Sequence, residues 1–260
     1  MDFRIGNNMD KITFIGNGNM ALSIAKGLKD SFDIEVVGRS NSSMDSFENK
    51  LGIKIEKVLY EDFNMDNKIV ILCVKPANVV EISPKLKGVA KELYSVLAGT
   101  KLEVLKEYIP AKKIVRAMPN LCATVNRSMT TLTGDIDLKD SAIELFNSIG
   151  STLWLSSQKE LDIATAVAGS GPAYLALIHE ALCDGAVKQG MKRADAIEVT
   201  NGLFNGFGEL ITTTHPAILK DGVMSPGGTT AAGYSALEQH GVRYGCIKAV
   251  EDAFEVTKLS

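Results

Sequence analysis

The sequence lacks the cysteine and histidine patterns that disulfide frameworks and metal sites require. It has four cysteines and three histidines in 260 residues. Cys73, Cys122, Cys183 and Cys246 are widely scattered, with no CxxC pair and no histidine at a matching spacing. Cys73 and Cys183 lie within apolar segments, where a thiol is a small core residue. We therefore expect neither a disulfide scaffold nor a bound metal, and this usage fits a reducing cytoplasm.

An excess of one charge and a long apolar run are also missing. The net charge is −3 and both signs are interspersed, so no electrostatic footprint indicates binding to nucleic acid or an anionic membrane. The longest apolar runs, such as 69–74, are far shorter than the roughly 20 residues of a membrane-spanning helix. No charged-then-apolar signal peptide opens the chain, and we expect the polar residues 1–8 to be a disordered extension. These absences predict a cytoplasmic protein without nucleic-acid or membrane partners.

The first part of the chain alternates short apolar runs with helical patterns. The continuously apolar run 69–74 is typical of a parallel strand buried on both faces. Strands are predicted at 12–15, 34–37, 69–74, 94–97, 113–116, 129–132 and 152–155, and helices at 20–29, 42–51 and 140–149. Strand–helix alternation predicts an α/β fold whose N-terminal domain, residues 9–157, is a doubly wound Rossmann-type sheet.

The pattern changes after Trp154, and from Lys159 onward we find helical patterns without a strand-like run. We therefore place a boundary near residues 156–160 and expect an all-helical domain at 158–260. Its helices are predicted at 173–189, 194–212 and 230–240, followed by an amphipathic terminal helix. Gly169, Gly171 and Pro172 interrupt an apolar helical stretch, and we favour tight helix packing over direct substrate contact as their reason. The apolar helices rich in Gly and Ala predict a dimerisation surface.

A glycine-rich turn follows the first strand and opens the first helix. It reads Gly16-Asn17-Gly18-Asn19-Met20-Ala21. In this context the first Gly makes the turn, the second lets the backbone approach a pyrophosphate, and Ala21 permits close helix–strand packing. The helix N-terminus then offers unpaired N–H groups to the phosphates. We assign this turn, with Gly16, Asn17, Gly18, Asn19 and Met20 as contacts, to a dinucleotide.

The tip of the second strand indicates which nicotinamide cofactor binds. An NAD enzyme usually carries a carboxylate there, which would repel a 2′-phosphate. Here Arg39 and Ser40 follow the strand, and a guanidinium can pair with a phosphate. Glu35 is the one complication, but it lies mid-strand and several residues too early. We therefore expect NADPH, with NADH possible but weaker.

The segment 219–230 is a turn followed by a helix. Pro226 fixes its own backbone torsion, whereas Gly227 and Gly228 can adopt torsions that are closed to other residues. Three hydroxyl residues lie around them in the sequence. The apolar-periodic run after it predicts a helix that starts near Thr229 or Thr230. Such a loop suits a carboxylate or phosphate, although its spacing alone is equally compatible with an ordinary loop before a helix.

The wording of this loop, "SPGGTT" shortly after "HPAILKD", resembles the signature of pyrroline-5-carboxylate reductases, which complete proline synthesis. "CVKP", "LAGT", "GSGPAY" and "DGAVKQGM" resemble the same family in order and spacing, so the resemblance covers nearly the whole chain. It implies NADPH-dependent reduction of L-1-pyrroline-5-carboxylate to L-proline in amino-acid biosynthesis. It also implies an interlocked homodimer, sometimes assembled further. This chain departs from the family at two positions. An Asn that some members use to bind the cofactor aligns near Tyr60, and the family Asn just before the signature loop is Gly222 here.

The resemblance carries residue roles with it. It implies cofactor contacts at Lys75 and Ala98, and Asn120 lies in a short motif that looks like the family's. We assign Thr230 as the catalytic residue whose hydroxyl bonds the ring nitrogen. The substrate-binding residues, which hold the carboxylate through a side chain or backbone N–H groups, are Ser225, Gly227, Gly228, Thr229 and Thr230. A protonated imine is already electrophilic, so a strong protein acid is not required.

Two other functions fit parts of the sequence. A hydroxy-acid dehydrogenase of the same architecture needs a proton-transfer group, and Lys188 is the only tempting candidate, although a cation near a helix end has a simpler explanation. A nucleotide sensor would keep the glycine turn but has no need for the hydroxyl-rich loop. The histidines, His179, His215 and His240, are best explained as structural residues, since none belongs to a Cys/His or Ser/His arrangement.

Overall fold

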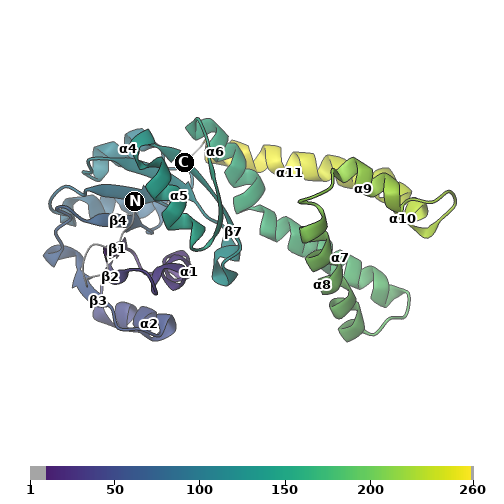
Figure 1. The fold of residues 1–260 in the computed structure, drawn as a ribbon, viewed down its shortest axis with the longest axis horizontal. Coiled ribbons are helices and arrows are strands. Elements are labelled where there is room, and N and C mark those ends of the chain that lie inside the picture. Colours follow the sequence, from purple (N-terminus) through teal and green to yellow (C-terminus); the bar gives the residue numbers. More distant parts are fainter. Residues whose placement is uncertain (1–9, 259–260) are drawn as a thin grey trace. The chain divides into compact units, whose positions relative to one another are not determined.

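The structure is a computed structural model that describes residues 10–258. The expected disordered extension at 1–8 lies outside the described residues. The chain divides into two compact units. The first unit runs to Ser170 and includes the chain from Ala253 onward, and the second unit is Gly171–Asp252. The colours of Figure 1 separate them, because the purple-to-teal chain forms the first unit and most of the green and yellow chain forms the second.

The first unit is built on one eight-stranded sheet in the order β3-β2-β1-β4-β5-β6-β7-β8. Its strands are β1 Lys11–Ile15, β2 Asp33–Gly38, β3 Glu56–Leu59, β4 Ile69–Leu72, β5 Glu92–Ser95, β6 Ile114–Met118, β7 Ser128–Gly134 and β8 Gly150–Trp154. Every neighbouring pair is parallel except β6 and β7. The Rossmann-type prediction is confirmed, and the antiparallel pair is the departure from it. Only a short 3₁₀ turn, Leu121–Val125, separates these two strands, so the chain returns without a crossover helix.

Helices cover both faces of this sheet, as a doubly wound fold requires. They are α1 Asn19–Leu28, α2 Asn41–Leu51, α3 Val79–Ile82, α4 Leu102–Tyr108, α5 Lys139–Asn147 and α6 Gln158–Ala164. Successive strand residues enter different cores: Phe14 packs in one cluster with Ile71, whereas Ile15 packs in the other. This alternation follows from the strand period of two. β3 and α4 were not predicted, because β3 is short and has no fully buried residue and α4 buries only Leu105.

The second unit is helical, as predicted. Its helices are α7 Gly171–Lys188, α8 Arg193–Leu210, α9 Pro216–Val223, α10 Thr229–Gln239 and α11 Val242–Thr257, the last of which ends in the first unit. The predicted interruption is a π-helical turn at Thr165–Gly169, and Pro172 lies at the start of α7, where its missing N–H costs nothing. The compact units separate at Gly171, because α6 buries Leu161 within the first unit.

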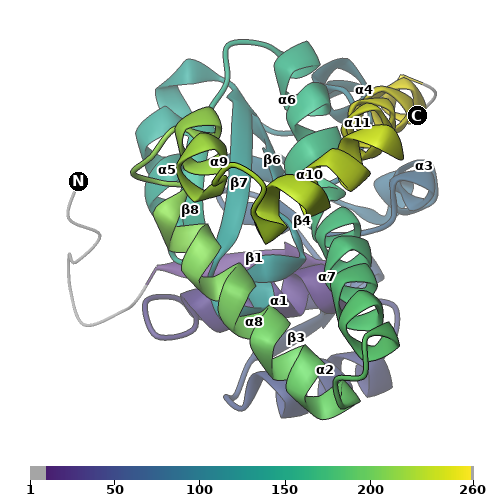
Figure 2. The same cartoon turned by 90° about the vertical axis from the view of Figure 1, so that its right-hand side faces the viewer.

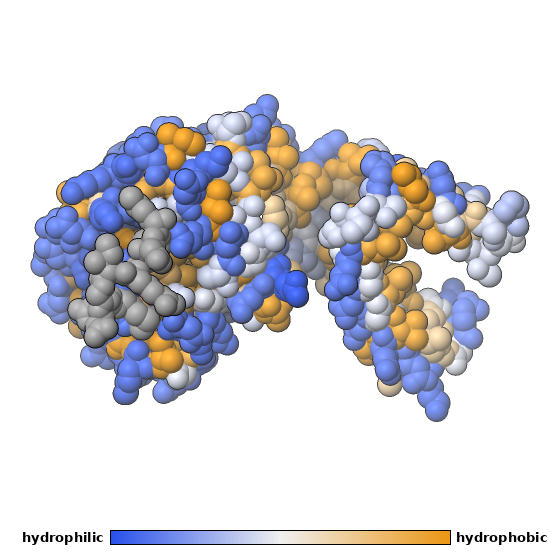
Figure 3. All heavy atoms as spheres, in the orientation of Figure 1, coloured by the Kyte–Doolittle hydropathy of each residue, from blue (hydrophilic) through white to orange (hydrophobic). Residues whose placement is uncertain are grey.

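Large apolar side chains of the second unit are exposed. α9 and α10 bury none of their residues within the chain. Figure 3 shows apolar surface gathered along these helices. Exposed large residues here include Leu175, Leu177, Val199, Leu203, Phe207, Ile218, Leu237 and Ile247. The continuous helical stretch Gln158–Lys188 is long and apolar enough to cross a membrane by length and composition alone. The uninterrupted apolar runs in the sequence did not indicate such a helix. Only 17% of its most apolar window is buried. Surface of this kind indicates an interface.

Candidate functional site

The predicted cofactor residues follow five neighbouring parallel strands at the same edge of the sheet. Gly16 follows β1, Arg39 follows β2, Lys75 follows β4, Ala98 follows β5 and Asn120 follows β6. The strand order reverses between β1 and β4, since β2 lies on one side of β1 and β4 on the other. Ligands of open α/β sheets bind outside the carboxyl ends of the strands at such a switch point.

The glycine turn after β1 is shaped for a ligand backbone. Gly16 has a φ of +101°, and a Cβ there would lie 2.8 Å from the carbonyl oxygen of Cys73. Its N–H donates to the carbonyl of Val37 at 3.0 Å, which draws the ends of β1 and β2 together. At Gly18, by contrast, a Cβ would meet no protein atom within 4 Å. The first glycine is therefore required by the fold, and the second leaves room for a pyrophosphate.

The start of α1 supplies the donors for such a group. Gly18 is the N-cap and has no side chain to cap the helix. The N–H of Leu22 is the first to find a helical acceptor, the carbonyl of Gly18 at 3.0 Å. The N–H groups of Asn19, Met20 and Ala21 precede it and point out of the helix end, where partial positive charge favours an anion. In the described chain, the buried Nδ2 of Asn17 is also left without a hydrogen-bond partner. These residues fit a dinucleotide.

The end of β2 carries a cation and no carboxylate. Arg39 is exposed, and its positive charge opposes the rise in the pKa of Tyr60 that burial causes. Ser40 is the N-cap of α2, and its Oγ accepts from the N–H of Ser43 at 3.4 Å. Glu35 is buried inside the strand, where its carboxylate accepts from Lys68 Nζ at 2.6 Å and from Thr13 Oγ1 at 2.5 Å. Glu35 is therefore already paired, and the strand tip suits a phosphate.

The residues after β4, β5 and β6 differ in how free their side chains are. Lys75 and Ala98 are exposed at the sheet edge. Asn120 is buried, and its Oδ1 accepts from the N–H of Cys122 at 3.0 Å. Its Nδ2 donates to the carbonyl of Ala168 at 2.9 Å. Asn120 therefore links β6 to the π-helical turn, a role that the sequence did not indicate.

The signature loop contains a tight turn with the geometry of type II. Gly228 N–H donates to the carbonyl of Ser225 at 3.0 Å, Pro226 occupies the second position, and Gly227 has a φ of +70°. This turn type takes Pro at its second position and needs a positive φ, hence Gly, at its third. A Cβ on Gly228 would lie 2.4 Å from Ser225 Oγ. The sequence Ser-Pro-Gly-Gly thus specifies the turn locally.

The turn changes which backbone donors are free. Because the N–H of Gly228 closes the turn, it does not serve a carboxylate as we assigned it. α10 begins at Thr229 with Gly228 as N-cap, and the N–H of Ala232 is the first to reach a helical acceptor. Thr229, Thr230 and Ala231 therefore present the outward N–H groups of the first turn. Sequence reasoning missed Ala231, which counting from the helix start would have found.

Thr230 lies within α10 and does not cap it. The N-cap is Gly228, and no side chain makes a capping hydrogen bond there. Thr230 is exposed, as are Ser225 and Gly227. Its hydroxyl is therefore free of the capping role that Thr commonly has at helix starts. The structure places the assigned substrate residues in one loop and the first turn of one helix.

The three histidines have structural partners. His215 is the N-cap of α9, and its Nδ1 accepts from the N–H of Ala217 at 3.3 Å. Nδ1 of His240 lies 2.8 Å from the carbonyl oxygen of Ala236 in the last turn of α10. His179 is hydrogen-bonded to Asn201, with 2.9 Å between Nε2 and Oδ1. The structural interpretation of all three agrees with these contacts.

One cysteine–histidine contact escaped the sequence analysis. Cys183 Sγ lies 3.8 Å from His179 Nδ1, one helical turn earlier on α7. The spacing of four residues could have revealed it. The thiol is buried and also lies 3.6 Å from the carbonyl oxygen of Ala196, so no substrate reaches it. No group of three potential metal ligands occurs among residues 10–258.

A buried charged network on the sheet was also missed. Arg116 of β6 is fully buried and pairs with Asp162 of α6, with 2.7 Å between Nη2 and Oδ1. Arg116 Nη1 donates to Gln158 Oε1 at 3.3 Å, and the same oxygen accepts from the N–H of Leu102 at 2.7 Å. The sequence feature that could have revealed this network is an arginine inside the otherwise apolar run 114–118. The network joins β6, α4 and α6.

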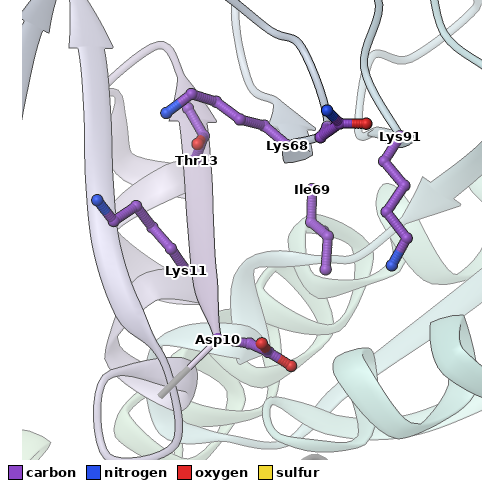
Figure 4. A pocket seen from close by; sticks show the side chains of 7 residues that line it. Asp10, Lys11, Thr13, Lys68, Ile69 and Lys91 are labelled. Carbon is purple, nitrogen blue, oxygen red and sulfur yellow. The ribbon is translucent and has the colours of Figure 1, made fainter. Parts of the chain in front are cut away.

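A hollow lies at the opposite edge of the sheet. Figure 4 shows it lined by the amino ends of β1 and β4, with Lys11, Lys68 and Lys91 around it. Lys11 donates to Glu56 at 2.5 Å, Lys68 to Glu35 at 2.6 Å, and Lys91 lies 3.2 Å from Glu92. Because each cation already has a carboxylate, this hollow carries no site.

Comparison with known proteins also divides the chain into two parts, with the second beginning at residue 158. Residues 158–259 match the family profile "Pyrroline-5-carboxylate reductase dimerisation", and residues 11–99 match "NADP oxidoreductase coenzyme F420-dependent". A pyrroline-5-carboxylate reductase of Pisum sativum is 38% identical, covering 91% of each chain.

Two solved structures resemble the whole chain. The 1-pyrroline-5-carboxylate reductase of Streptococcus pyogenes has a TM-score of 0.88 at 31% identity, covering 98% of this chain and 100% of its own. The pyrroline carboxylate reductase of Plasmodium falciparum, with NADP bound, has a TM-score of 0.80 at 27% identity. That comparison covers 98% of this chain and 99% of the Plasmodium chain.

Proposed function

The chain belongs to the pyrroline-5-carboxylate reductase family, and we propose that it makes L-proline by reducing L-1-pyrroline-5-carboxylate through the residues described above. It is an NAD(P)H-dependent oxidoreductase. The observation that carries the function is the 38% identity to a pyrroline-5-carboxylate reductase over 91% of both chains. Because the likeness includes both the glycine turn and the helical region, it concerns the whole enzyme and not only its nucleotide-binding half.

The cofactor is held, in this proposal, by the carboxyl edge of the sheet. The N–H groups at the start of α1 bind the pyrophosphate, and Arg39 with Ser40 binds the 2′-phosphate. Arg39 is exposed and no free carboxylate stands at the tip of β2, which supports a preference for NADPH over NADH. Lys75 and Ala98 line the same edge. When bound, the nicotinamide supplies the hydride that reduces the imine carbon.

The substrate carboxylate is held by the first turn of α10. In this proposal the carboxylate accepts from the outward N–H groups of Thr229, Thr230 and Ala231, from the N–H of Gly227 and from the hydroxyl of Ser225; the first three are free because α10 begins at Thr229. Thr230 directs its hydroxyl to the ring nitrogen. Because that nitrogen is protonated before reduction, the hydroxyl has to orient the ring and not to deliver a proton. On this mechanism the reaction needs no histidine or lysine as an acid.

The rival hydroxy-acid chemistry finds little support in the helices. Lys188 is exposed in the last turn of α7, where a cation interacts favourably with the helix end. Within residues 10–258, Lys188 makes no hydrogen bond or ion pair with another side chain.

The enzyme is a homo-oligomer, and we propose a dimer, alone or assembled further. The exposed apolar residues lie on helices within residues 158–259, the region that matches the dimerisation profile. Covering them by a second copy removes this surface from water, which is the dominant favourable term in association. The same covering accounts for the apolar stretch Gln158–Lys188 without a membrane.

All four cysteines are free, which supports a reducing cytoplasm as the compartment.

A single assay separates the possible functions. We expect steady-state oxidation of NADPH with L-1-pyrroline-5-carboxylate, and no reduction of NADP with 2-hydroxy acids. Turnover of hydroxy acids alone would support the dehydrogenase, and binding of NADPH without turnover of either substrate would support the sensor.

Light scattering at micromolar concentration measures the oligomeric state, and a monomer at that concentration contradicts the proposed dimer.

A further inference from the structure

The helices that flank the signature loop have no apolar anchor within the chain. α9 and α10 bury none of their described residues. Figure 2 lets the reader follow α9, the loop and α10 in the yellow-green part of the chain. In the proposed dimer a second copy covers their apolar residues, but binding a small anion also requires backbone donors in a fixed arrangement. Within one chain, polar contacts between the two helices have to hold the ends of this loop.

One side-chain contact bridges the loop. Lys220 Nζ of α9 lies 5.3 Å from the ring centroid of Tyr234 in α10. Lys220 also pairs with Asp221 at 2.7 Å. This cation–π pair joins side chains of α9 and α10 across the signature loop. Its two residues stand on either side of the Ser225–Gly228 turn, so the contact links the two helices across the loop.

A charged network holds the tyrosine itself in place. The hydroxyl of Tyr234 donates to Glu238 Oε1 at 2.5 Å and accepts from Arg243 Nη2 at 2.6 Å. Arg243, in the first turn of α11, also donates from Nε to Glu238 Oε1 at 3.0 Å. Hydrogen bonds from Arg243 and Tyr234 lower the pKa of Glu238 to about 2. The carboxylate is therefore ionised throughout the pH range in which the enzyme is assayed.

We propose that Lys220, Tyr234, Glu238 and Arg243 form a positioning cluster that sets the geometry of the signature loop for the substrate carboxylate. Lys220 fixes the α9 end of the loop against the Tyr234 ring, and Glu238 with Arg243 fixes that ring. None of the four touches the reacting atoms in this proposal. The inference rests on the proposed function, since it assigns the loop to the imine substrate.

The test is a kinetic double-mutant cycle on the full-length enzyme, with Lys220→Met, Tyr234→Leu and the double variant. Each single change should lower kcat/KM for L-1-pyrroline-5-carboxylate by about twofold to fivefold, the range that an exposed cation–π contact gives. The KM for NADPH and the oligomeric state should stay unchanged. If the two residues act through one contact, the double variant loses no more than the worse single variant. Lys220→Arg keeps the cation and should restore activity.

A matched control separates positioning from loss of surface charge. Lys248 is 39% exposed, as Lys220 is, and pairs with Glu251 of its own helix at 2.8 Å but contacts no ring in the described structure. Lys248→Met should therefore leave kcat/KM unchanged. Equal losses in Lys220→Met and Lys248→Met, or fully additive losses in the cycle, overturn the positioning role. Wild-type enzyme that fails to reduce the imine overturns the proposed function itself.

Discussion

The pair between Arg116 and Asp162 gives the sharpest prediction about stability. Arg116 is 1% exposed and Asp162 12% exposed in their side chains, with 2.7 Å between Nη2 and Oδ1. Asp162→Asn removes the carboxylate charge with almost no change in volume. The guanidinium then stays buried without a counter-charge, because Gln158 offers only a neutral amide oxygen. Breaking one partner of a buried pair typically costs about 3–5 kcal/mol.

We expect Asp162→Asn to lie near the lower end of that range. The residual exposure of Asp162 lets some water reach Arg116 after the change, and the Asn oxygen can still accept one hydrogen bond. The expected loss is therefore about 3 kcal/mol in the free energy of unfolding. Arg116→Met combined with Asp162→Leu removes both charges and should be far less destabilising than the single change, because buried pairs replaced by apolar residues are often neutral.

The assay is urea unfolding followed by far-UV circular dichroism at one fixed protein concentration, since an oligomer's stability depends on concentration. A shift in midpoint at constant m-value reports the change in stability. Glu251→Gln is the control, because it breaks an exposed pair with Lys248 that contributes about 0–1 kcal/mol. If Asp162→Asn costs no more than Glu251→Gln, or the double variant is as unstable as the single one, the argument from buried charge is refuted.

The remaining predictions concern the two binding elements. Arg39→Ala should raise the KM for NADPH roughly tenfold to a hundredfold, from a contact of about 1.5–3 kcal/mol, and leave NADH little changed; equal effects on both cofactors would mean that Arg39 does not contact the 2′-phosphate. Thr230→Ala should slow turnover at saturating NADPH about tenfold to a hundredfold at equal fold content, whereas Thr229→Ala, whose backbone alone has a role, should not. A larger loss in Thr229→Ala would shift our register of the loop by one residue. Gly16→Ala should lower the midpoint of thermal unfolding, because the backbone has a positive φ there and the carbonyl of Cys73 leaves no room for a Cβ. Gly18→Ala should fold normally, because its Cβ meets no protein atom, but should bind NADPH weakly in a fluorescence titration. Equal thermal midpoints for these two variants would contradict the distinction between them.

Local sequence determined the features whose torsions depend on a few neighbouring residues. The glycine turn after β1 is where the sequence placed it, because Gly16 takes a φ that other residues disfavour. The helix predicted near Thr229 or Thr230 begins at Thr229, because Pro226 and Gly227 specify the turn before it. Hydrophobic periodicity likewise located the long helices of the second unit and most strands of the sheet.

Tertiary structure decided what each polar group faces once the elements have packed. The sequence could not show that Asn120 bonds the carbonyl of Ala168, or that Arg116 meets Asp162 across 46 residues of chain. The antiparallel return of β7 was also clear only from the structure, because the sequence pattern did not show that no crossover helix separates β6 from β7. The sequence predicted an apolar dimerisation surface on the helices of the second unit, and the structure showed which side chains form it. The physical reason is common to these cases: torsional preferences act between neighbours in the chain, whereas burial, pairing and desolvation depend on segments that the fold brings together.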